Sequence, residues 1–457
     1  MNQRTRSLWR ATVALIALLA LGAGCASTDP VVSVGSPLPS AAASTAPRST
    51  DEPEPSQTPS VTPEQTAGSQ PSTTPEANGS GAYTIATDTS ESQKTYYSEQ
   101  ADENALRVEN GAIAGIDGAH VEKRAGDASS LENTLSSGLN AAALARADAQ
   151  LLLVNSEVSA SALGAGGAFA NAARIQLQNS VVRVTGASAY ALAAASGGSA
   201  TARDSTLSTQ GASSPAIVAG KNGSVYIEGG MVTTGGTGAP VISSAGGVIA
   251  SSATLRANSS EAVAVNGGSV TLTDSALSGR MNDPTGMQAS PYCVALYRDG
   301  GAGGESASFS MTRGALTALK GDLFYATNTS ASIYLESVAL ALGDGRALLR
   351  VAGNDGSRGW GEAGENGATC ALVAKDQTLS GNILVDELSS LSLTLRGKSA
   401  YTGAVNAANT ARAAKVTLED DAVWTLTDNA YLTAFTGRVS SIVTNGFTVY
   451  VNGVPLT

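Results

Sequence analysis

The sequence predicts an all-β protein built as a parallel β-helix, and two observations lead to this prediction. Short apolar runs recur through residues 151–340 between Gly, Asn, Asp and Ser turns, with a period in the low twenties. That pattern is typical of a solenoid whose coils are made of strands. Only 4% of the residues are aromatic, which suits small side chains stacked in a narrow interior better than one large globular core.

One apolar position defines the period. It recurs at spacings of 24, 25, 25, 23, 22, 39 and 23 residues, at Val158, Val182, Leu207, Val232, Leu255, Leu277, Leu316 and Ala339. We interpret the spacing of 39 as one coil plus an insertion. Leucine-rich repeats share the period but need a fixed Leu and Asn frame, which is missing here.

The strands expected between the turns are three to five residues long, such as residues 226–228, 270–273 and 332–335. Thr394 and Thr417 lie 23 residues apart, as do Tyr401 and Trp424, so coils continue almost to the end. From about residue 100 this gives roughly thirteen to fifteen coils of about 4.8 Å each. We expect end caps at residues 91–110 and 446–457.

Residues 1–25 resemble a bacterial lipoprotein signal peptide. Three arginines precede an apolar run at residues 11–21, which is too short to span a bilayer permanently, and Cys25 follows. Gly22 stands where such signals more often have Leu. The resemblance implies that Cys25 carries the lipid and anchors the chain outside the cytoplasmic membrane; the alternative is an ordinary signal peptide cleaved nearby.

Residues 26–82 form a predicted disordered linker, rich in Pro, Ser, Thr, Ala and Glu, that cannot bury a core. Ten of the fifteen prolines lie between Pro30 and Pro75. At roughly 3 Å per residue its upper reach is on the order of 170 Å, so it is either a stalk that crosses a cell wall or a plain linker. The β-helix domain is expected over residues 83–457.

The net charge of -11, without a basic cluster after the signal, makes nucleic acid an unsuitable partner. Cys293 and Cys370 lie in apolar runs about three coils apart, roughly 14 Å. A disulfide needs α-carbons within about 7 Å, so two buried free thiols are expected.

Catalytic signals are weak. His120 is the single histidine, and no nucleophile motif accompanies it. Asp204 and Asp274 share a repeat position but are three coils apart, about 14 Å, which exceeds the separation of about 10 Å or less in a glycosidase pair. Residues 419–421 face residues 396–398 one coil earlier and are interpreted as a solvated corner.

Three breaks in the repeat are the places where loops can carry function. In residues 123–133, the side chains of Asp127, Glu132 and Asn133 offer oxygen ligands for calcium. The second break covers residues 281–290 and 298–305.

In the third break, residues 353–367, a Gly-rich segment carries Trp360. Asp355, Arg358 and Glu362 flank it, which suggests a platform for stacking on a sugar. The alternative is a Trp that folds back over an exposed coil.

Several segments together resemble a family of bacterial surface proteins: residues 123–133, the Asp-Ser corners, and residues 321–329, 376–381 and 444–453. The family consists of right-handed, single-stranded parallel β-helices with a pectin-lyase-like fold, often labelled adhesin-like. The resemblance covers about residues 105–455 and implies the fold and a cell-surface location. It supplies no catalytic residues, and the fold by itself does not define an activity.

Two functions are therefore compatible with the sequence. The first is a non-catalytic, lipid-anchored display or adhesion module that meets polysaccharides or surface proteins and needs no cofactor. The second is a carbohydrate-active enzyme, a lyase or hydrolase, using Asp322, Asp355 or Glu362 in a groove between the inserted loops. A threonine array for ice binding is a weaker third interpretation, because the Thr positions do not keep one column over many coils.

Overall fold

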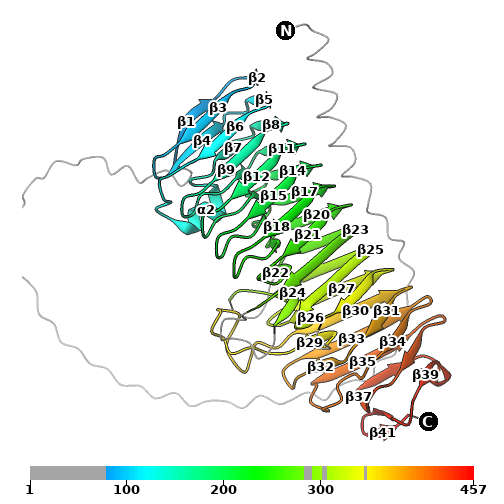
Figure 1. Ribbon diagram of the computed structural model, residues 1–457. Helices are drawn as coiled ribbons and strands as arrows, with labels where there is room; N and C mark the ends of the chain where they lie inside the picture. The colour runs from blue at the N-terminus through cyan, green and yellow to red at the C-terminus, as the bar shows by residue number, and fades with distance from the viewer. Residues whose placement is uncertain (1–78, 283–290, 301–305, 344–346, 457) are drawn as a thin grey trace, which may run out of the picture. The chain divides into compact units, whose positions relative to one another are not determined.

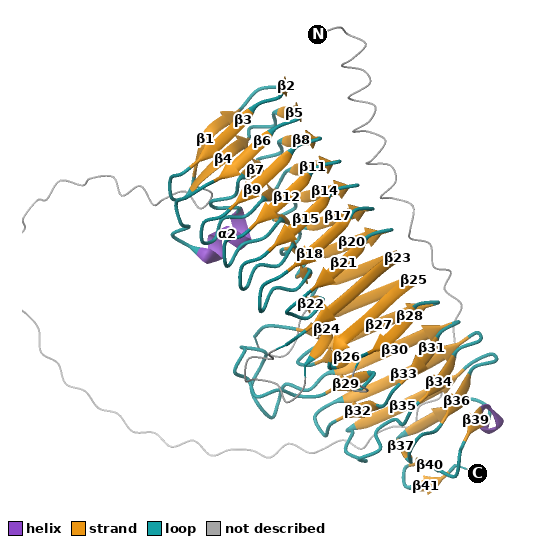
Figure 2. Ribbon diagram, viewed as in Figure 1, coloured by secondary structure: helices purple, strands orange, loops and turns teal. Residues whose placement is uncertain are grey.

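The protein folds as a parallel β-helix, which confirms the predicted fold class (Figure 1). The computed structural model describes residues 79–282, 291–300, 306–343 and 347–456. The predicted signal peptide with Cys25 and nearly all of the predicted linker lie outside these residues. A regular coil contributes one strand to each of three faces, for example β13 (Leu192–Ala195), β14 (Ser199–Arg203) and β15 (Thr206–Thr209); Figure 2 labels β14 and β15 of this coil.

The first face is one parallel sheet of twelve strands. They are β1 (Ser80–Ile85), β4 (Glu103–Val108), β7 (Ala143–Arg146), β10 (Ala168–Asn171), β13, β16 (Ile217–Ala219), β19 (Ile242–Ser244), β22 (Val263–Asn266), β24 (Tyr292–Tyr297), β26 (Asp322–Ala326), β29 (Leu349–Val351) and β32 (Ile383–Val385).

The second face follows a corner after each of these strands. Its strands are β2 (Thr89–Ser92), β5 (Ile113–Asp117), β8 (Gln150–Val154), β11 (Arg174–Gln178), β14, β17 (Ser224–Glu228), β20 (Gly247–Ser251), the first parts of β23 (Ser269–Arg280) and β25 (Ala307–Lys320), β27 (Ser330–Glu336), β30 (Thr369–Lys375), β33 (Ser390–Arg396), β35 (Ala413–Leu418) and β38 (Ala434–Thr436).

The third face completes each coil. Its strands are β3 (Thr95–Ser98), β6 (His120–Lys123), β9 (Glu157–Ala160), β12 (Val181–Val184), β15, β18 (Met231–Thr234), β21 (Thr254–Ala257), the second parts of β23 and β25, β28 (Ala339–Leu342), and then β31 (Thr378–Ser380), β34 (Ala400–Thr402), β36 (Val423–Thr425) and β39 (Ile442–Val443).

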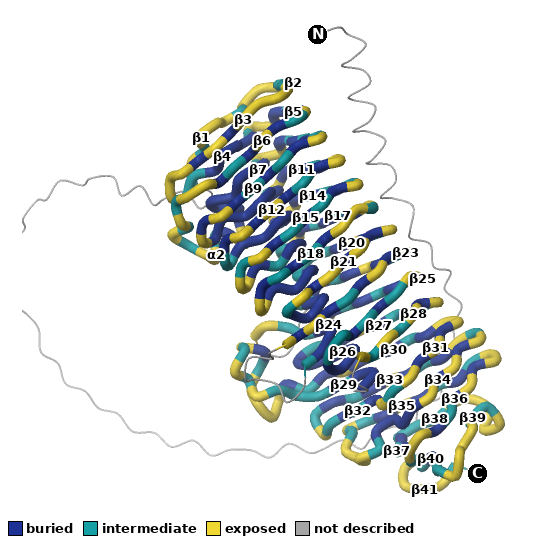
Figure 3. Tube along the Cα trace, in the orientation of Figure 1, coloured by how far each residue is buried: buried dark blue, intermediate teal, exposed yellow. Residues whose placement is uncertain are grey.

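Inward side chains stack in columns that match the period read from the sequence. Val182 pairs with Val158 and Leu207 on its two neighbouring coils, and Leu277 pairs directly with Leu316. The 39-residue spacing is therefore one coil with an insertion, as predicted. Buried residues run along the strands of the coils between the two terminal ones in Figure 3, so the core is continuous along the solenoid.

One predicted position in this column is wrong. The partner of Leu316 is Leu340, whereas Ala339 pairs with Ala315 and is exposed. Neighbouring side chains of a strand point to opposite faces. The predicted step from Leu316 was one residue too short, so it led to the outward Ala339 and not to the inward Leu340. The C-terminal register is confirmed, since Thr394 pairs with Thr417 and Tyr401 pairs with Trp424.

A buried serine ladder holds the corner between the second and third faces. The residue that turns the corner has a positive φ, 48° at Asn155 and at Asn179, a conformation that Asn and Asp tolerate better than most residues. The serine that follows bonds to the preceding coil: Ser180 Oγ accepts from Ser156 N–H of that coil at 3.1 Å, and it donates to Gln178 O of its own coil at 2.9 Å. The Asn-Ser and Asp-Ser pairs thus satisfy backbone groups that the corner removes from the sheets.

The N-terminal end differs from the cap expected from the sequence, whereas the C-terminal residues 446–457 depart from the regular coils, as expected of a cap. Residues 91–110 contain β3, β4 and the second half of β2, which are ordinary coil strands, and the solenoid begins at Ser80, inside the range assigned to the linker. At the other end, β40 (Val449–Val451) pairs with β37 (Ala430–Leu432) and forms an antiparallel pair with β41 (Val454–Pro455). The described part of the chain contains no helix long and apolar enough to cross a membrane.

Both cysteines of the described solenoid are free and buried, as predicted. Cys293 lies on β24 of the first face, and Cys370 lies on β30 of the second. They are two coil steps apart, one fewer than expected, because inserted residues lengthen the chain between them without adding coils. Burial raises the pKa of each thiol to about 12.

The serine ladder predicts the effect of Ser180→Ala. Removing the hydroxyl leaves the buried Ser156 N–H without its acceptor, which we expect to lower the free energy of unfolding by about 1–3 kcal/mol. Urea unfolding followed by circular dichroism measures this. Ser159→Ala, at an outward half-buried position of β9, is the control, and equal stability of the two variants would contradict the role of the ladder.

The thiol pKa values predict that Cys293 and Cys370 resist alkylation at pH 8 in the folded protein and react after unfolding. Unfolded thiols ionise near pH 9 and the folded ones near 12. The folded state is therefore increasingly disfavoured as the pH rises from about 9 to 12. Mass spectrometry after iodoacetamide treatment, with and without urea, checks the result; rapid labelling in the native state would contradict it.

Candidate binding groove

The outer side of the first face carries a column of side chains, which are large at the two ends of the column and small in its middle. Strand pairing places its members in one row: Leu144, Phe169, Ala193, Val218, Ser243, Ala264, Ala295 and Tyr325. The large members at each end belong to separate outer clusters, while Ser243 and Ala264 between them remain small. A hollow therefore forms over β19 and β22.

Helix α2 (Leu131–Ser137) covers the first end of this column. Ser130 caps its N-terminus by accepting from Asn133 N–H, and Gly138 ends it with a left-handed φ of 79°. Near this helix, Leu144 and Phe169 pack with Tyr190 in a buried outer cluster, in which Phe169 and Tyr190 meet edge to face at 5.5 Å. The helix leaves Leu135 42% exposed toward the groove.

The loop at residues 353–367 forms the other end, and the amide of Asn366 organises it. Asn366 Nδ2 donates to Asn354 O at 3.0 Å and to Trp360 O at 3.2 Å, and its Oδ1 accepts from Asn354 N–H at 3.0 Å. Asn366 is 1% exposed, so these bonds fix the loop from inside. The loop of residues 353–367 and helix α2 lie on the same side of the solenoid (Figure 2).

Trp360 is packed by this loop onto Tyr297. Their rings stack with centroids 4.0 Å apart, and Trp360 is only 6% exposed. The Arg358 guanidinium lies 5.0 Å from the centre of the Trp360 ring and donates to Tyr292 Oη at 2.7 Å. Trp360 therefore folds back over the coil, as in the simpler of the two interpretations, and does not present an open stacking surface.

Between these ends lies a groove of about 450 Å³. Its walls come from the turns that lead into the first-face strands of successive coils. Its lining residues are Leu135, Pro215, Gly238, Pro240, Ser243, Ser259, Ser260, Glu261, Ala264, Met281, Tyr297, Arg358 and Trp360.

Among the described residues, the groove lining has one carboxyl group and one guanidinium among mostly apolar and hydroxyl groups. Glu261 is 8% exposed, and its Oε2 accepts from Ser260 Oγ at 2.5 Å. Burial raises the pKa of Tyr297, and the nearby Asp299 and Glu261 charges raise it further, so the Tyr297 hydroxyl remains protonated. The groove thus offers a neutral phenol, a carboxyl group and a guanidinium in one hollow.

The structure places two of the predicted ligand residues, Trp360 and Arg358, at the groove. The other two lie elsewhere on the loop: Asp355 and Glu362 are exposed and are not in the lining. Asp355 accepts from Ser357 N–H and Oγ, which lowers the pKa of its carboxyl group. Asp355 therefore caps a turn of the loop.

The residues considered for calcium are used in local structure. Asp127 accepts from Leu163 N–H at 3.0 Å, Glu132 is exposed in the first turn of α2, and Asn133 O accepts the capping N–H of Gly138. Within the described residues, no group of three or more His, Cys, Asp or Glu side chains is arranged to hold a metal ion. The observed contacts do not favour calcium at this break.

The carboxylates suggested for catalysis do not meet. Asp322 is 1% exposed and forms an ion pair with Arg350 at 2.7 Å, whereas Asp355 and Glu362 are exposed. The acidic residues 419–421 form a solvated corner, as predicted: Glu419 pairs with Arg396 at 2.9 Å and Asp420 accepts from Gly397 N–H. Most of the second break, residues 283–290 and 301–305, lies outside the described residues.

Sequence reasoning missed Glu261 and Tyr297, whereas Met281 is the first residue of the second predicted break. Glu261 lies in the turn before β22, and Met281 and Tyr297 flank or end β24 on the next coil, so no local motif links them. Comparison of the chain with protein-family models gives no match, and comparison with curated proteins gives none either. The groove must therefore be interpreted from its own chemistry.

Asn366→Ala is predicted to release the loop. Loss of three internal hydrogen bonds should separate Trp360 from Tyr297 and make the Arg358 peptide bond accessible to trypsin. Limited proteolysis and tryptophan fluorescence measure the two effects. Glu365→Ala, at the exposed neighbouring position, should cleave like the unaltered chain, and equal cleavage of both variants would show that Asn366 does not hold the loop.

Proposed function

We propose that this protein is a non-catalytic, lipid-anchored binding module of the bacterial cell surface, and that it holds an extended polysaccharide in the groove on the first face. The observation that carries the proposal is the groove itself, which is closed at one end by α2 and at the other by the Tyr297, Arg358 and Trp360 wall. Its floor follows the coil axis over β19 and β22.

The lining suits a carbohydrate. Sugar rings present apolar faces between hydroxyl groups, and binding sites for them combine aromatic and apolar walls with a few placed polar groups. Here Tyr297 is the half-exposed aromatic, and Ser243, Ser260, Glu261 and Arg358 supply donors and acceptors. The groove passes coils that repeat at about 4.8 Å, a step close to the length of one sugar unit in an extended chain.

The acidic groups favour binding over cleavage. Glycoside hydrolysis normally uses two carboxyl groups on either side of the scissile bond, within about 10 Å. Glu261 is the carboxylate of the groove lining, and Asp322, Asp355 and Glu362 belong to other surroundings. The carbohydrate-active enzyme remains the alternative, and release of sugar in the binding experiment would favour it.

The anchor and the location rest on the sequence. Cys25 follows an apolar segment with the features of a lipoprotein signal, and the solenoid resembles surface β-helix proteins. Thiol titration of unfolded protein isolated from cells tests the anchor. Two thiols are expected when Cys25 carries the lipid, and three thiols would exclude it.

Tyr297→Ala is predicted to weaken polysaccharide binding about tenfold or more, because an aromatic anchor at the centre of a contact typically contributes more than 1 kcal/mol. Retention of the full chain on a panel of host and plant polysaccharides, with released sugar scored in parallel, identifies the ligand and measures the change. Tyr226→Ala, at an outward half-buried position of β17 on the second face, is the matched control.

Loss of binding in both tyrosine variants would place the ligand elsewhere. Retention of all polysaccharides at background level would overturn the proposal and direct attention to protein ligands. Addition of calcium to one arm of the panel also tests the weaker metal prediction at Asp127, Glu132 and Asn133.

A further inference from the structure

The third face is interrupted between β28 and β31. β28 pairs with β25 on one side, and β31 pairs with β34 on the other. Within the described residues, no strand pairing joins β28 to β31. Yet the same two coils pair without a break on the second face, from Ser330 with Thr369 to Glu336 with Lys375. The coils are therefore in register and separate only after the corner.

The backbone groups that face this opening can be assigned. Gly343 N–H donates to Ala318 O on the β25 side, and successive residues of a paired strand direct their groups to opposite neighbours. The groups of Leu340 therefore face β31. In the other strand, Gly381 N–H donates to Thr402 O on the β34 side, so Thr378 N–H faces β28.

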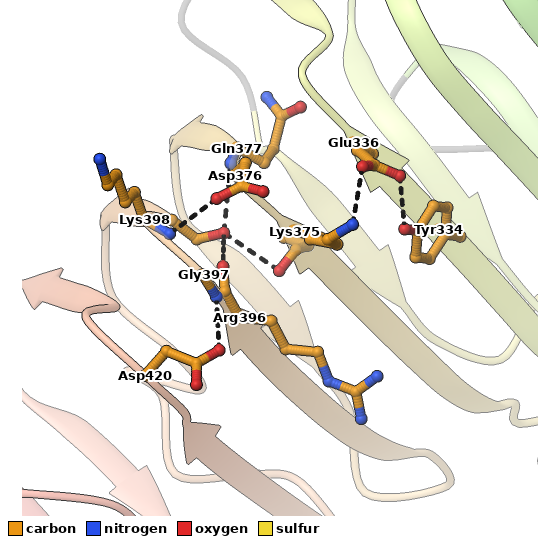
Figure 4. A network of polar contacts seen from close by, with 11 residues as sticks. Tyr334, Glu336, Lys375, Asp376, Gln377, Arg396, Gly397, Lys398 and Asp420 are labelled. Atoms are coloured by element: carbon orange, nitrogen blue, oxygen red, sulfur yellow. Dashed lines mark hydrogen bonds and ion pairs between the residues drawn. The ribbon is translucent and has the colours of Figure 1, made fainter.

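Gln377 closes the corner end of the opening. Other corners have a serine at this place, such as Ser180 and Ser399, but the longer Gln377 side chain reaches across to the preceding coil. Its Oε1 accepts from Val338 N–H at 2.7 Å, and its Nε2 donates to Val338 O at 2.8 Å. The side-chain amide thus pairs with Val338 as the peptide group of a strand would. Figure 4 shows Gln377 beside Asp376 at this corner.

Beyond Gln377 the opening is a cavity of about 420 Å³. It is lined by Ser337, Val338, Ala339, Leu340, Leu342, Asp376, Gln377, Thr378 and Ser380. Leu340 and Leu342 are half-buried here, whereas the equivalent Leu316 and Ala318 one coil earlier are 0% exposed. The apolar interior of the solenoid is therefore accessible between these two strands.

We propose that this opening is a second binding site, for an extended polypeptide segment of another protein that adds as a β-strand beside β28 and β31. Strand edges are completed most directly by a peptide backbone, because only it supplies N–H and C=O groups at the strand spacing. Alternate apolar side chains of the segment cover Leu340 and Leu342. In this proposal a basic residue of the bound segment is placed beside Asp376, the exposed carboxylate of the lining.

The ladders on both sides support this occupant. An added strand continues the parallel pairing of β25 with β28 or that of β31 with β34. Gln377 occupies the corner and therefore fixes where the N-terminal end of a parallel segment lies. The site lies on the third face and shares no lining residue with the groove on the first face, so the two proposals fail independently.

The test uses the full chain and a fluorescein-labelled peptide with an N-terminal lysine followed by alternating valine and threonine. Fluorescence anisotropy should show saturable binding. Methylating alternate backbone nitrogens of the peptide keeps its side chains but removes donors, and should weaken binding about tenfold or more. Equal binding of both peptides, or binding of neither, overturns the proposal.

Thr378→Pro and Thr378→Ala provide the matched pair in the protein. Proline removes the N–H that faces the opening at an edge position where proline is tolerated, and alanine keeps it. Binding should fall about tenfold or more only in Thr378→Pro. If circular dichroism shows that this variant does not fold, hydrogen exchange on the unaltered chain decides: the peptide should slow exchange at Leu340 and Thr378, and unchanged rates overturn the proposal.

Discussion

The hydrogen bonding of each coil to its neighbours determines the rest of this structure. A strand in the solenoid has its backbone partners one coil away, so a slip of one residue would turn its apolar side chains outward. The column from Val158 through Val182 to Leu277 and Leu316 keeps this register even across the insertion. Extra residues are accommodated in loops, and the ladder resumes unchanged. Both candidate sites are placed on this fixed frame.

The two sites are made by different departures from the regular coil. The groove on the first face keeps every strand pairing and arises where the outward column shrinks to Ser243 and Ala264. The opening on the third face keeps the inward column and loses the pairing of β28 with β31. One departure changes side-chain size, and the other changes backbone hydrogen bonding. Their ligands are accordingly expected to differ in chemistry.

The sequence predicts the parts of this structure that repeat. The period identified the fold, the inward column and the pairing of Tyr401 with Trp424, because each coil constrains the same positions again. The prediction failed at positions where the repeat gives no second example. Ala339 was chosen in place of Leu340. Residues 91–110 were expected to form a cap but form coil strands. Trp360 was correctly identified as unusual, yet its burial against Tyr297 depends on a fold of the loop that spacing does not encode.

The groove was not predictable, because Glu261, Tyr297 and Arg358 come from separate coils and meet only after the solenoid is built. Its modular floor has a consequence for how this surface can change. One more coil with a small outward residue beside Ser243 would lengthen the groove by about 4.8 Å and leave both end walls intact. Under the proposed function, duplication or loss of single coils would therefore change the number of ligand units that the groove holds.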